Sequence, residues 1–235
     1  MTPKLPHRNL LAAIAATVTI AGVAMVPSAA AQSPCAELGG TVDTGQICQV
    51  HSTTSNYTFD MSVPLDYPDQ QAVFDYLKQD RADFVDWFAK FGKDGRDRPY
   101  MHDVTAKTFR SGTPTSGTQS LVLDIDDDTG AAHQGHPNTW FKAFNYDVGK
   151  HAPITFDTLF KPGTDPLAVL NPMVKQKFGT HPERPVQALD ATTYQSFAIT
   201  DDAVIFFFGQ DQVIPDNNGP HQISVPRAEL ASLLA

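Results

Sequence analysis

Alternating carboxylates form the most suggestive chemical pattern in this 235-residue chain. Asp124, Asp126 and Asp128 have the spacing with which a calcium-binding loop collects oxygen ligands. The sixth position of such a loop is Thr129 and the twelfth is Gly135, where a helix–loop–helix calcium site has glycine and glutamate. The pattern therefore favours a solvated, charged hairpin loop over a metal site.

His133 and His136 follow in the same segment, at a spacing that could hold one metal ion together with a carboxylate. The segment also contains Gly130 and Gly135, and histidines in a glycine-containing loop are more often exposed turn residues. Metal binding stays the weaker alternative here, and we expect no resident cofactor.

Known catalytic motifs do not occur in the chain. There is no G-x-S-x-G nucleophile elbow, no H-E-x-x-H pair, no phosphate loop and no dinucleotide fingerprint. Ser116 and Gly117 lie in a turn-forming stretch rather than between a strand and a helix. We therefore predict no catalytic residues and a protein that is not an enzyme. A cell-envelope hydrolase with an unfamiliar site is the catalytic alternative.

Residues 1–31 have the three parts of a secretory signal peptide. Two basic residues precede a stretch without charge, residues 10–26, and small residues precede the expected cut. The uncharged stretch is shorter and less apolar than the roughly 20 residues that a membrane-spanning helix needs. We expect cleavage between Ala31 and Gln32, secretion, and no stable membrane span afterwards.

The chain is acidic, with 17 Lys and Arg against 26 Asp and Glu and a net charge of −9. Removing residues 1–31 takes away two basic residues and no acidic ones, so the mature chain has a net charge of 15 − 26 = −11. Such a charge disfavours nucleic acid and anionic lipid as partners. It suits a basic protein partner, or keeps an exported protein soluble.

Cys35 and Cys48 are the only two cysteines. In an oxidising compartment an isolated pair is most simply a disulfide, and closing this loop is worth on the order of 3 kcal/mol. A redox or metal role would need C-x-x-C spacing or a neighbouring histidine, and neither is present.

Hydrophobic periodicity predicts one long helix and several strands. Alternation over residues 57–63 indicates a half-buried strand, and residues 70–91 form an amphipathic helix that Gly92 ends. Further strands are expected at 100–109, 121–125, 139–146, 203–208 and 222–225, with the uncharged 203–208 segment central in a sheet.

Short helices are expected in the carboxy-terminal third. Asp165 and Pro166 suit the N-cap and first position of a helix that Pro172 breaks or kinks, and Pro226 begins a terminal helix. Because strands predominate and helices do not alternate with them, we expect an α+β fold with mixed or largely antiparallel sheets.

Large rings alternate along residues 140–144 and 206–208, so some of them face away from a single core. A sheet covered on both faces is the favoured interpretation. An exposed aromatic patch for a protein or lipid partner is the alternative.

Four segments resemble the mycobacterial secreted immunogenic protein, a major culture-filtrate antigen, and its actinobacterial relatives. They are residues 35–50, 65–77, 139–174 and 193–230. The resemblance includes both cysteines and does not extend closely to residues 111–136. It implies export and antigenicity.

The carboxy-terminal half is also similar to the extracellular domain of lysozyme-binding anti-sigma factors. The similarity includes the turn at 135–137, the strand exit at 145–150 and the segment 155–160. It implies a β-grasp-like α+β fold and interaction rather than turnover. We expect a disulfide-stapled region at 32–134 that packs with a carboxy-terminal region at 135–235.

These inferences favour a secreted, non-catalytic interaction protein whose partner is a host or envelope component. A module that binds lysozyme or another basic protein is the alternative, since the mature chain is strongly acidic.

Overall fold

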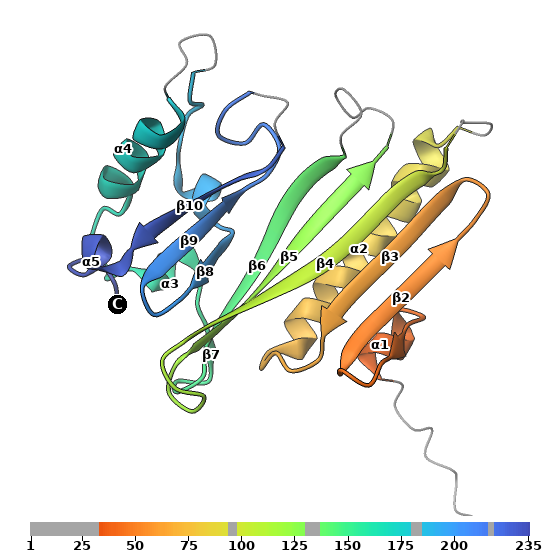
Figure 1. Ribbon diagram of the computed structural model, residues 1–235, viewed down its shortest axis with the longest axis horizontal. Coiled ribbons are helices and arrows are strands. Elements are labelled where there is room, and N and C mark those ends of the chain that lie inside the picture. The colour runs from red at the N-terminus through yellow and green to blue at the C-terminus, as the bar shows by residue number, and fades with distance from the viewer. Residues whose placement is uncertain (1–32, 94–97, 130–136, 180–184, 216–218) are drawn as a thin grey trace, which may run out of the picture. The chain divides into compact units, whose positions relative to one another are not determined.

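Two β-sheets and one long helix organise the protein, as the computed structural model shows (Figure 1). The structure describes residues 33–93, 98–129, 137–179, 185–215 and 219–235. The expected signal peptide, its cleavage between Ala31 and Gln32, and the pair His133 and His136 lie outside these residues. The predicted α+β class, with mixed sheets, one long helix and shorter helices after it, is confirmed.

The larger sheet has seven strands in sequence order. Neighbouring strands are antiparallel except β3 and β4, which are parallel because the long helix α2 carries the chain back between them. The strands are β1 (Thr41–Val42), β2 (Ile47–Thr53), β3 (Tyr57–Pro64), β4 (Tyr100–Ser111), β5 (Thr118–Asp128), β6 (Asn138–Asp147) and β7 (Ala152–Pro153).

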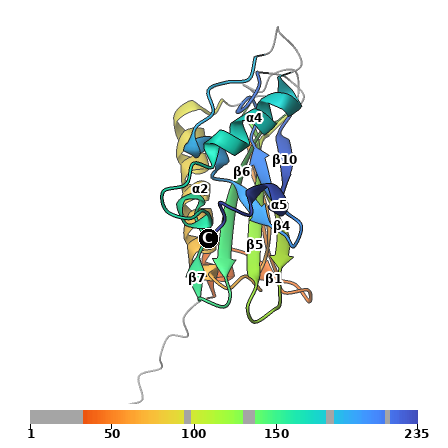
Figure 2. The same ribbon diagram turned by 90° about the vertical axis from the view of Figure 1, so that its left-hand side faces the viewer.

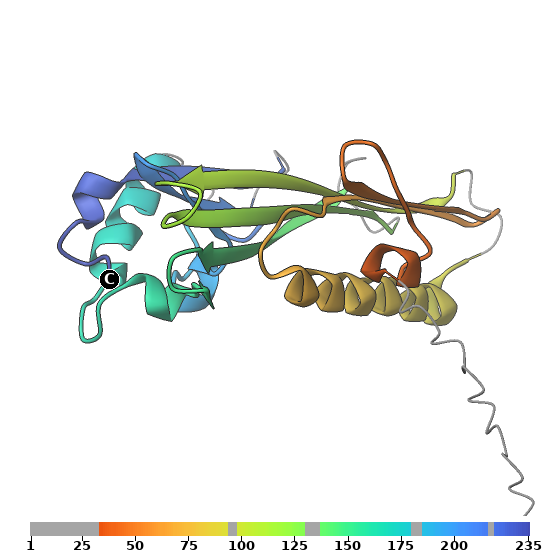
Figure 3. The ribbon, with the colours of Figure 1, turned by 90° about the horizontal axis from the view of Figure 1, so that it is seen from below.

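Helix α2 (Gln70–Phe91) has the predicted bounds and covers one face of this sheet (Figure 3). The Asp69 side chain accepts a hydrogen bond from the Ala72 N–H at 3.4 Å, which caps the first turn. Its buried side chains pack against alternate residues of the strands and form the first core. These helix residues are Val73, Phe74, Leu77 and Phe84.

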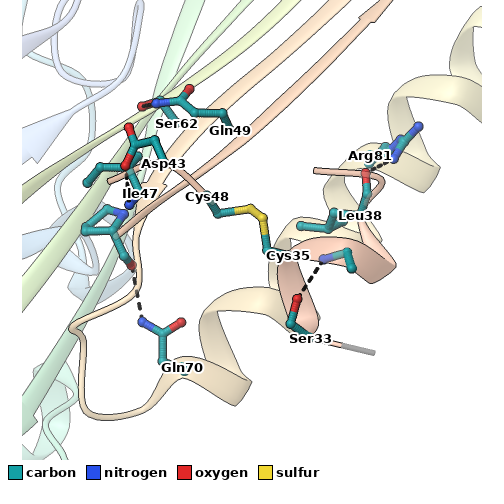
Figure 4. The surroundings of a disulfide bond; sticks show 12 residues. Ser33, Cys35, Leu38, Asp43, Ile47, Cys48, Gln49, Ser62, Gln70 and Arg81 are labelled. Carbon is teal, nitrogen blue, oxygen red and sulfur yellow. Dashed lines mark hydrogen bonds between the residues drawn. A yellow bond between two sulfur atoms is a disulfide. The ribbon is translucent and has the colours of Figure 1, made fainter. Parts of the chain in front are cut away.

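The predicted disulfide is confirmed (Figure 4). Cys35 lies in the short helix α1 (Pro34–Glu37) and bonds Cys48 of β2, with their Cα atoms 5.6 Å apart. Arg81 of α2 donates a hydrogen bond to the Leu38 carbonyl. The amino-terminal segment is therefore fixed to both the sheet and the helix.

The smaller sheet has the order β10–β9–β8, with β9 central as expected. Its strands are β8 (Phe197–Ile199), β9 (Ala203–Phe208) and β10 (His221–Pro226). Figure 2 shows α4 and α5 in front of this sheet, and their buried side chains join a second core with β9. The helical segments here are α3 (Phe156–Leu159), α4 (Leu167–Phe178), η2 (Ala191–Tyr194) and α5 (Arg227–Leu230).

The two sheets meet through aromatic side chains. Phe207 of β9 contacts Phe109 of β4 and Phe141 of β6, with ring centroids 5.9 and 5.3 Å apart. Phe206 and Phe208 point to the opposite side of β9 and are buried in the second core. The alternating rings of β9 therefore serve two cores, and the alternative of an exposed patch is wrong for this strand.

The structure differs from two local expectations, and the first of them is wrong. The acidic run is not a hairpin loop, because β5 continues to Asp128 and is paired with both β4 and β6. Of the two outcomes expected at Pro172, a break or a kink, the break does not occur, because α4 continues to Phe178. A proline removes one helical hydrogen bond, and burial of Leu170 and Val174 on either side outweighs that loss.

The division at residues 134 and 135 stays a prediction. The large sheet takes its strands β1 to β5 from before this position and β6 and β7 from after it.

Removing the disulfide should destabilise the fold. Replacing both cysteines, Cys35→Ser with Cys48→Ser, should lower the free energy of unfolding by about 3 kcal/mol, because the unfolded chain regains the freedom of the loop. Urea denaturation followed by circular dichroism measures the difference. Reduced wild-type protein is the matched control and should lose the same amount, whereas an unchanged midpoint in both would contradict this account.

Candidate functional site

The face of the large sheet opposite α2 carries a row of polar side chains. Strand pairing places His51 opposite Asp60, Asp60 opposite Asp103, and Asp103 opposite Asp126. Thr139 of β6 completes the row opposite Asp126. Since side chains alternate between the faces of a strand, this register decides which groups meet.

Three side chains of β2 and β3, Thr53, His51 and Asp60, form a hydrogen-bonded chain of a hydroxyl, an imidazole and a carboxylate, which we call the relay. The Nδ1 atom of His51 lies 2.5 Å from Oδ1 of Asp60, and its Nε2 atom lies 3.0 Å from Oγ1 of Thr53. His51 and Thr53 are two residues apart on one strand and therefore share a face. The His51 side chain is 71% exposed, so solvent and substrates can reach it.

The hydrogen bonds of the relay are compatible with a neutral imidazole. An ionised carboxylate only accepts, so its bond to Asp60 places a proton on Nδ1 of His51. When the imidazole is neutral, its Nε2 atom is an acceptor, and the Thr53 hydroxyl donates to it. This is the arrangement in which an imidazole takes a proton from a nucleophilic hydroxyl while a carboxylate orients the ring.

Motif searching missed this relay because its carboxylate lies on a different strand from the other two residues. A signal was nevertheless present in the sequence. His51 and Thr53 alternate with buried residues, and a short turn returns the chain so that Asp60 lies opposite His51.

Carboxylates next to the relay are crowded. Burial raises the pKa of Asp103, and the neighbouring Asp60 and Asp126 raise it further. Nearby groups offset part of this charge, since Lys107 pairs with Asp124 at 2.9 Å and the Thr139 hydroxyl donates to Asp126. The row therefore presents net negative charge beside the relay.

The predicted metal residues fall into different surroundings. Asp124, Asp126 and Asp128 share this face of β5, but each has its own partner, which for Asp128 is Arg98 at 3.0 Å. Within the part of the chain that the structure describes, no three His, Cys, Asp or Glu side chains gather closely enough to hold a metal ion. His133 and His136 are not among the described residues.

The opposite face buries a second histidine between two carboxylates. His102 is 1% exposed, with Nδ1 at 2.5 Å from Asp127 and Nε2 at 2.8 Å from Asp80. Its ring stacks on Phe59 with centroids 5.0 Å apart. Burial by itself would lower the pKa of His102, but the hydrogen bonds that the imidazole donates to the two aspartates outweigh burial and raise the pKa to about 9. A charged imidazole therefore joins α2 to β4 and β5.

The carboxy-terminal part of the chain matches a known protein family, and the whole fold resembles a solved structure. Residues 157–228 match the family described as Protein of unknown function (DUF3298). The structure of a DUF3298 family protein from Pseudomonas aeruginosa PAO1 superposes with a TM-score of 0.54 at 16% identity, covering 82% of this chain and 95% of that one. This likeness supports the fold alone.

Curated relatives match nearly the whole chain. Esterase Rv3036c of Mycobacterium tuberculosis is 44% identical over 225 residues, which are 93% of this chain and 97% of that protein. Immunogenic protein MPT64 of the same species and MPB64 of Mycobacterium bovis are each 39% identical over 215 residues, covering 89% of this chain and 92% of theirs.

The fold and these matches define an α+β protein with a DUF3298 domain. The chain belongs to the family of the mycobacterial immunogenic protein MPT64. The expected resemblance is thereby confirmed. Among the helices of the described residues, none is long and apolar enough to cross a membrane.

One prediction is contradicted by these relatives. The chain was expected not to be an enzyme, yet the relative with 44% identity is named an esterase. The expectation relied on the absence of known motifs, and a relay assembled across two strands has no such motif.

The buried charge on His102 should make stability depend on pH. Because its folded-state pKa of about 9 exceeds the ordinary value of 6.5, the stabilisation is fully present below pH 6.5 and is lost as the pH rises through 9. The free energy of unfolding should fall by roughly 3 kcal/mol between pH 6.5 and about pH 10. Urea denaturation across this range measures it.

His102→Gln is the matched variant for this measurement. It should be less stable than wild type at pH 6.5, and its stability should change little toward alkaline pH. An equal alkaline loss in both proteins would show that another group is responsible.

Proposed function

We propose that the protein is an exported ester hydrolase in which Thr53, His51 and Asp60 carry the reaction. The relay is the observation that supports this proposal most strongly, since its hydroxyl, imidazole and carboxylate are already within hydrogen-bonding distance. The esterase name of a relative that covers 93% of the chain supports it independently. The signal-like residues 1–31 support export.

The chemistry requires four proton transfers through one imidazole nitrogen, two as the acyl group forms and two as it is released. Nε2 of His51 takes the proton of the Thr53 hydroxyl as Oγ1 attacks the ester carbonyl, and then returns it to the departing alkoxide. This leaves an acyl group on Thr53 and releases the alcohol. Water then attacks the acyl group, gives its proton to Nε2, and releases the carboxylic acid while the proton restores the Thr53 hydroxyl.

The surroundings of the relay select among substrates. Asp103 lies next to Asp60 in the strand register, and Asp126 lies one strand further along the same face. Negative charge close to the reacting carbonyl disfavours esters of anionic acids and favours neutral or cationic esters. The open sheet face, with His51 exposed, suits small or extended esters.

Substitution of the relay should abolish hydrolysis. Thr53→Ala and His51→Ala should each lower kcat/KM for p-nitrophenyl acetate by at least about 100-fold, the usual effect of losing a nucleophile or a general base. Asp60→Asn should also lower it strongly, because the asparagine amide no longer favours the imidazole tautomer that carries its proton on Nδ1.

Thr105→Ala is the matched control, since Thr105 is exposed on the same face of β4. It should retain wild-type kcat/KM. Wild-type activity in both Thr53→Ala and His51→Ala, or no wild-type hydrolysis above the uncatalysed rate, would contradict the proposed function.

A second candidate function is binding of a basic protein such as lysozyme. The observation that favours it is the acidic row on the open face, together with a net charge of −11 for the chain after residue 31. Complementary charge steers association and is weakened by salt.

Calorimetry with hen lysozyme tests this second function. Binding should be tighter at low salt, and Asp103→Asn with Asp126→Asn should weaken it by at least about tenfold because two carboxylates leave the contact face. Asp157→Asn with Asp202→Asn removes the same charge from exposed positions elsewhere and should leave binding unchanged. An absence of heat at both low and physiological salt would refute the candidate.

A further inference from the structure

A groove runs along the outer edge of β6, at the far side of the large sheet from the relay strands. Its volume is about 220 Å³. The start of α2 forms one wall, and the segment from η2 into β8 forms the other, with Phe144 and Phe197 among the lining residues. The groove is therefore distinct from the site proposed for ester hydrolysis.

The floor of the groove is an incomplete strand edge. Alternate carbonyls of β6 point outward, and those on either side of Ala143 accept hydrogen bonds. The Phe141 carbonyl accepts a hydrogen bond from the Ser196 hydroxyl at 2.7 Å. The Asn145 backbone carbonyl accepts one from the Ile154 N–H, also at 2.7 Å. By the alternation of strands, Ala143 directs its N–H and C=O to the same edge. Within the described residues, no hydrogen bond reaches the Ala143 backbone from that side.

The chain itself covers only the neighbouring part of this edge. Strand β7 pairs with Tyr146 and Asp147 of β6. After Ile154 the chain turns away into α3, with Thr155 as its N-cap. Ala143 is thus the next position along an edge that β7 has begun to cover.

Asn145, which is among the lining residues, has a buried acceptor without a partner in the described part of the chain. Asn145 is 4% exposed, and its Nδ2 donates to the Phe197 carbonyl at 2.9 Å. That bond fixes the orientation of the amide. Its Oδ1 atom has no hydrogen-bond partner within the described residues. Leaving a buried acceptor unpaired is unfavourable, and a bound donor would remove that cost.

We propose that this groove binds a short extended peptide segment, which adds to β6 beside β7. An extended backbone offers the N–H and C=O groups that pair with Ala143, and a further N–H for the Oδ1 atom of Asn145. Its side chains alternate between the two walls, which place aromatic rings on both sides.

The dimensions of the groove fit this class of ligand. A drug-sized ligand usually needs about 300–1,000 Å³, whereas two residues of a strand advance roughly 7 Å and match the step from Ala143 to Asn145. Lys142 and Asp69 lie among the lining residues and offer both signs of charge to the ends of such a segment.

Amide exchange and peptide titration test the proposal by NMR. In the free protein, the Ala143 amide should exchange at least tenfold faster than the amides of Lys142 and Phe144, which point into the sheet. The probe is acetyl-Val-Thr-Val-amide, chosen for its preference for extended structure. It should cause saturable shifts at Ala143 and at the Asn145 side chain and should slow Ala143 exchange at least tenfold.

Ala143→Pro removes the outward N–H and is suited to an edge position. It should weaken peptide binding at least tenfold while ester hydrolysis stays at the wild-type rate, which separates this proposal from the proposed function. Ala143→Ser keeps the N–H and should bind normally. Slow exchange of Ala143 in free wild-type protein, saturable shifts confined to other residues, or no saturable shift at all would overturn the proposal.

Discussion

The register between β2 and β3 decides which side chains meet α2 and which meet solvent. In the observed register Cys48 and Val50 face the core, and His51 lies opposite Asp60 on the open face. A slip of one residue would send every side chain of β2 to the other face. The same shift would move Cys48 away from Cys35 and separate His51 from Asp60. The disulfide and the candidate site therefore both depend on the pairing of β2 with β3.

The buried His102 is the corresponding constraint on the other side of the sheet. Its two hydrogen bonds connect Asp80 on α2 with Asp127 on β5, and its own backbone lies in β4. Burying such charged groups is expensive unless all are paired, so the arrangement tolerates little movement of the helix over the strands. Because Asp126 and Asp127 are adjacent in β5, the His102 hydrogen bonds also help to position the acidic row on the opposite face.

Local patterns predicted the elements well but not the groups that they bring together. The bounds of α2 followed from its amphipathic face and from Gly92, and the central β9 followed from its apolar run. Aspartate is uncommon in strands, which is why the run through Asp128 suggested a loop; pairing with strands on both sides overrides that preference. His102 meets carboxylates that are 22 and 25 residues away, and no local pattern encodes such a contact.

The proposed ester hydrolysis lies on the open face of β2 and β3, and the proposed peptide groove lies at the far edge of the same sheet. The proposed hydrolysis requires a covalent acyl group on Thr53. Mixing the protein with p-nitrophenyl acetate, quenching it with acid and analysing its peptides by mass spectrometry tests this directly. The account predicts an acetyl group on Thr53 that disappears in Thr53→Ala. Turnover with acetyl only on other residues, or with none at all, would contradict it.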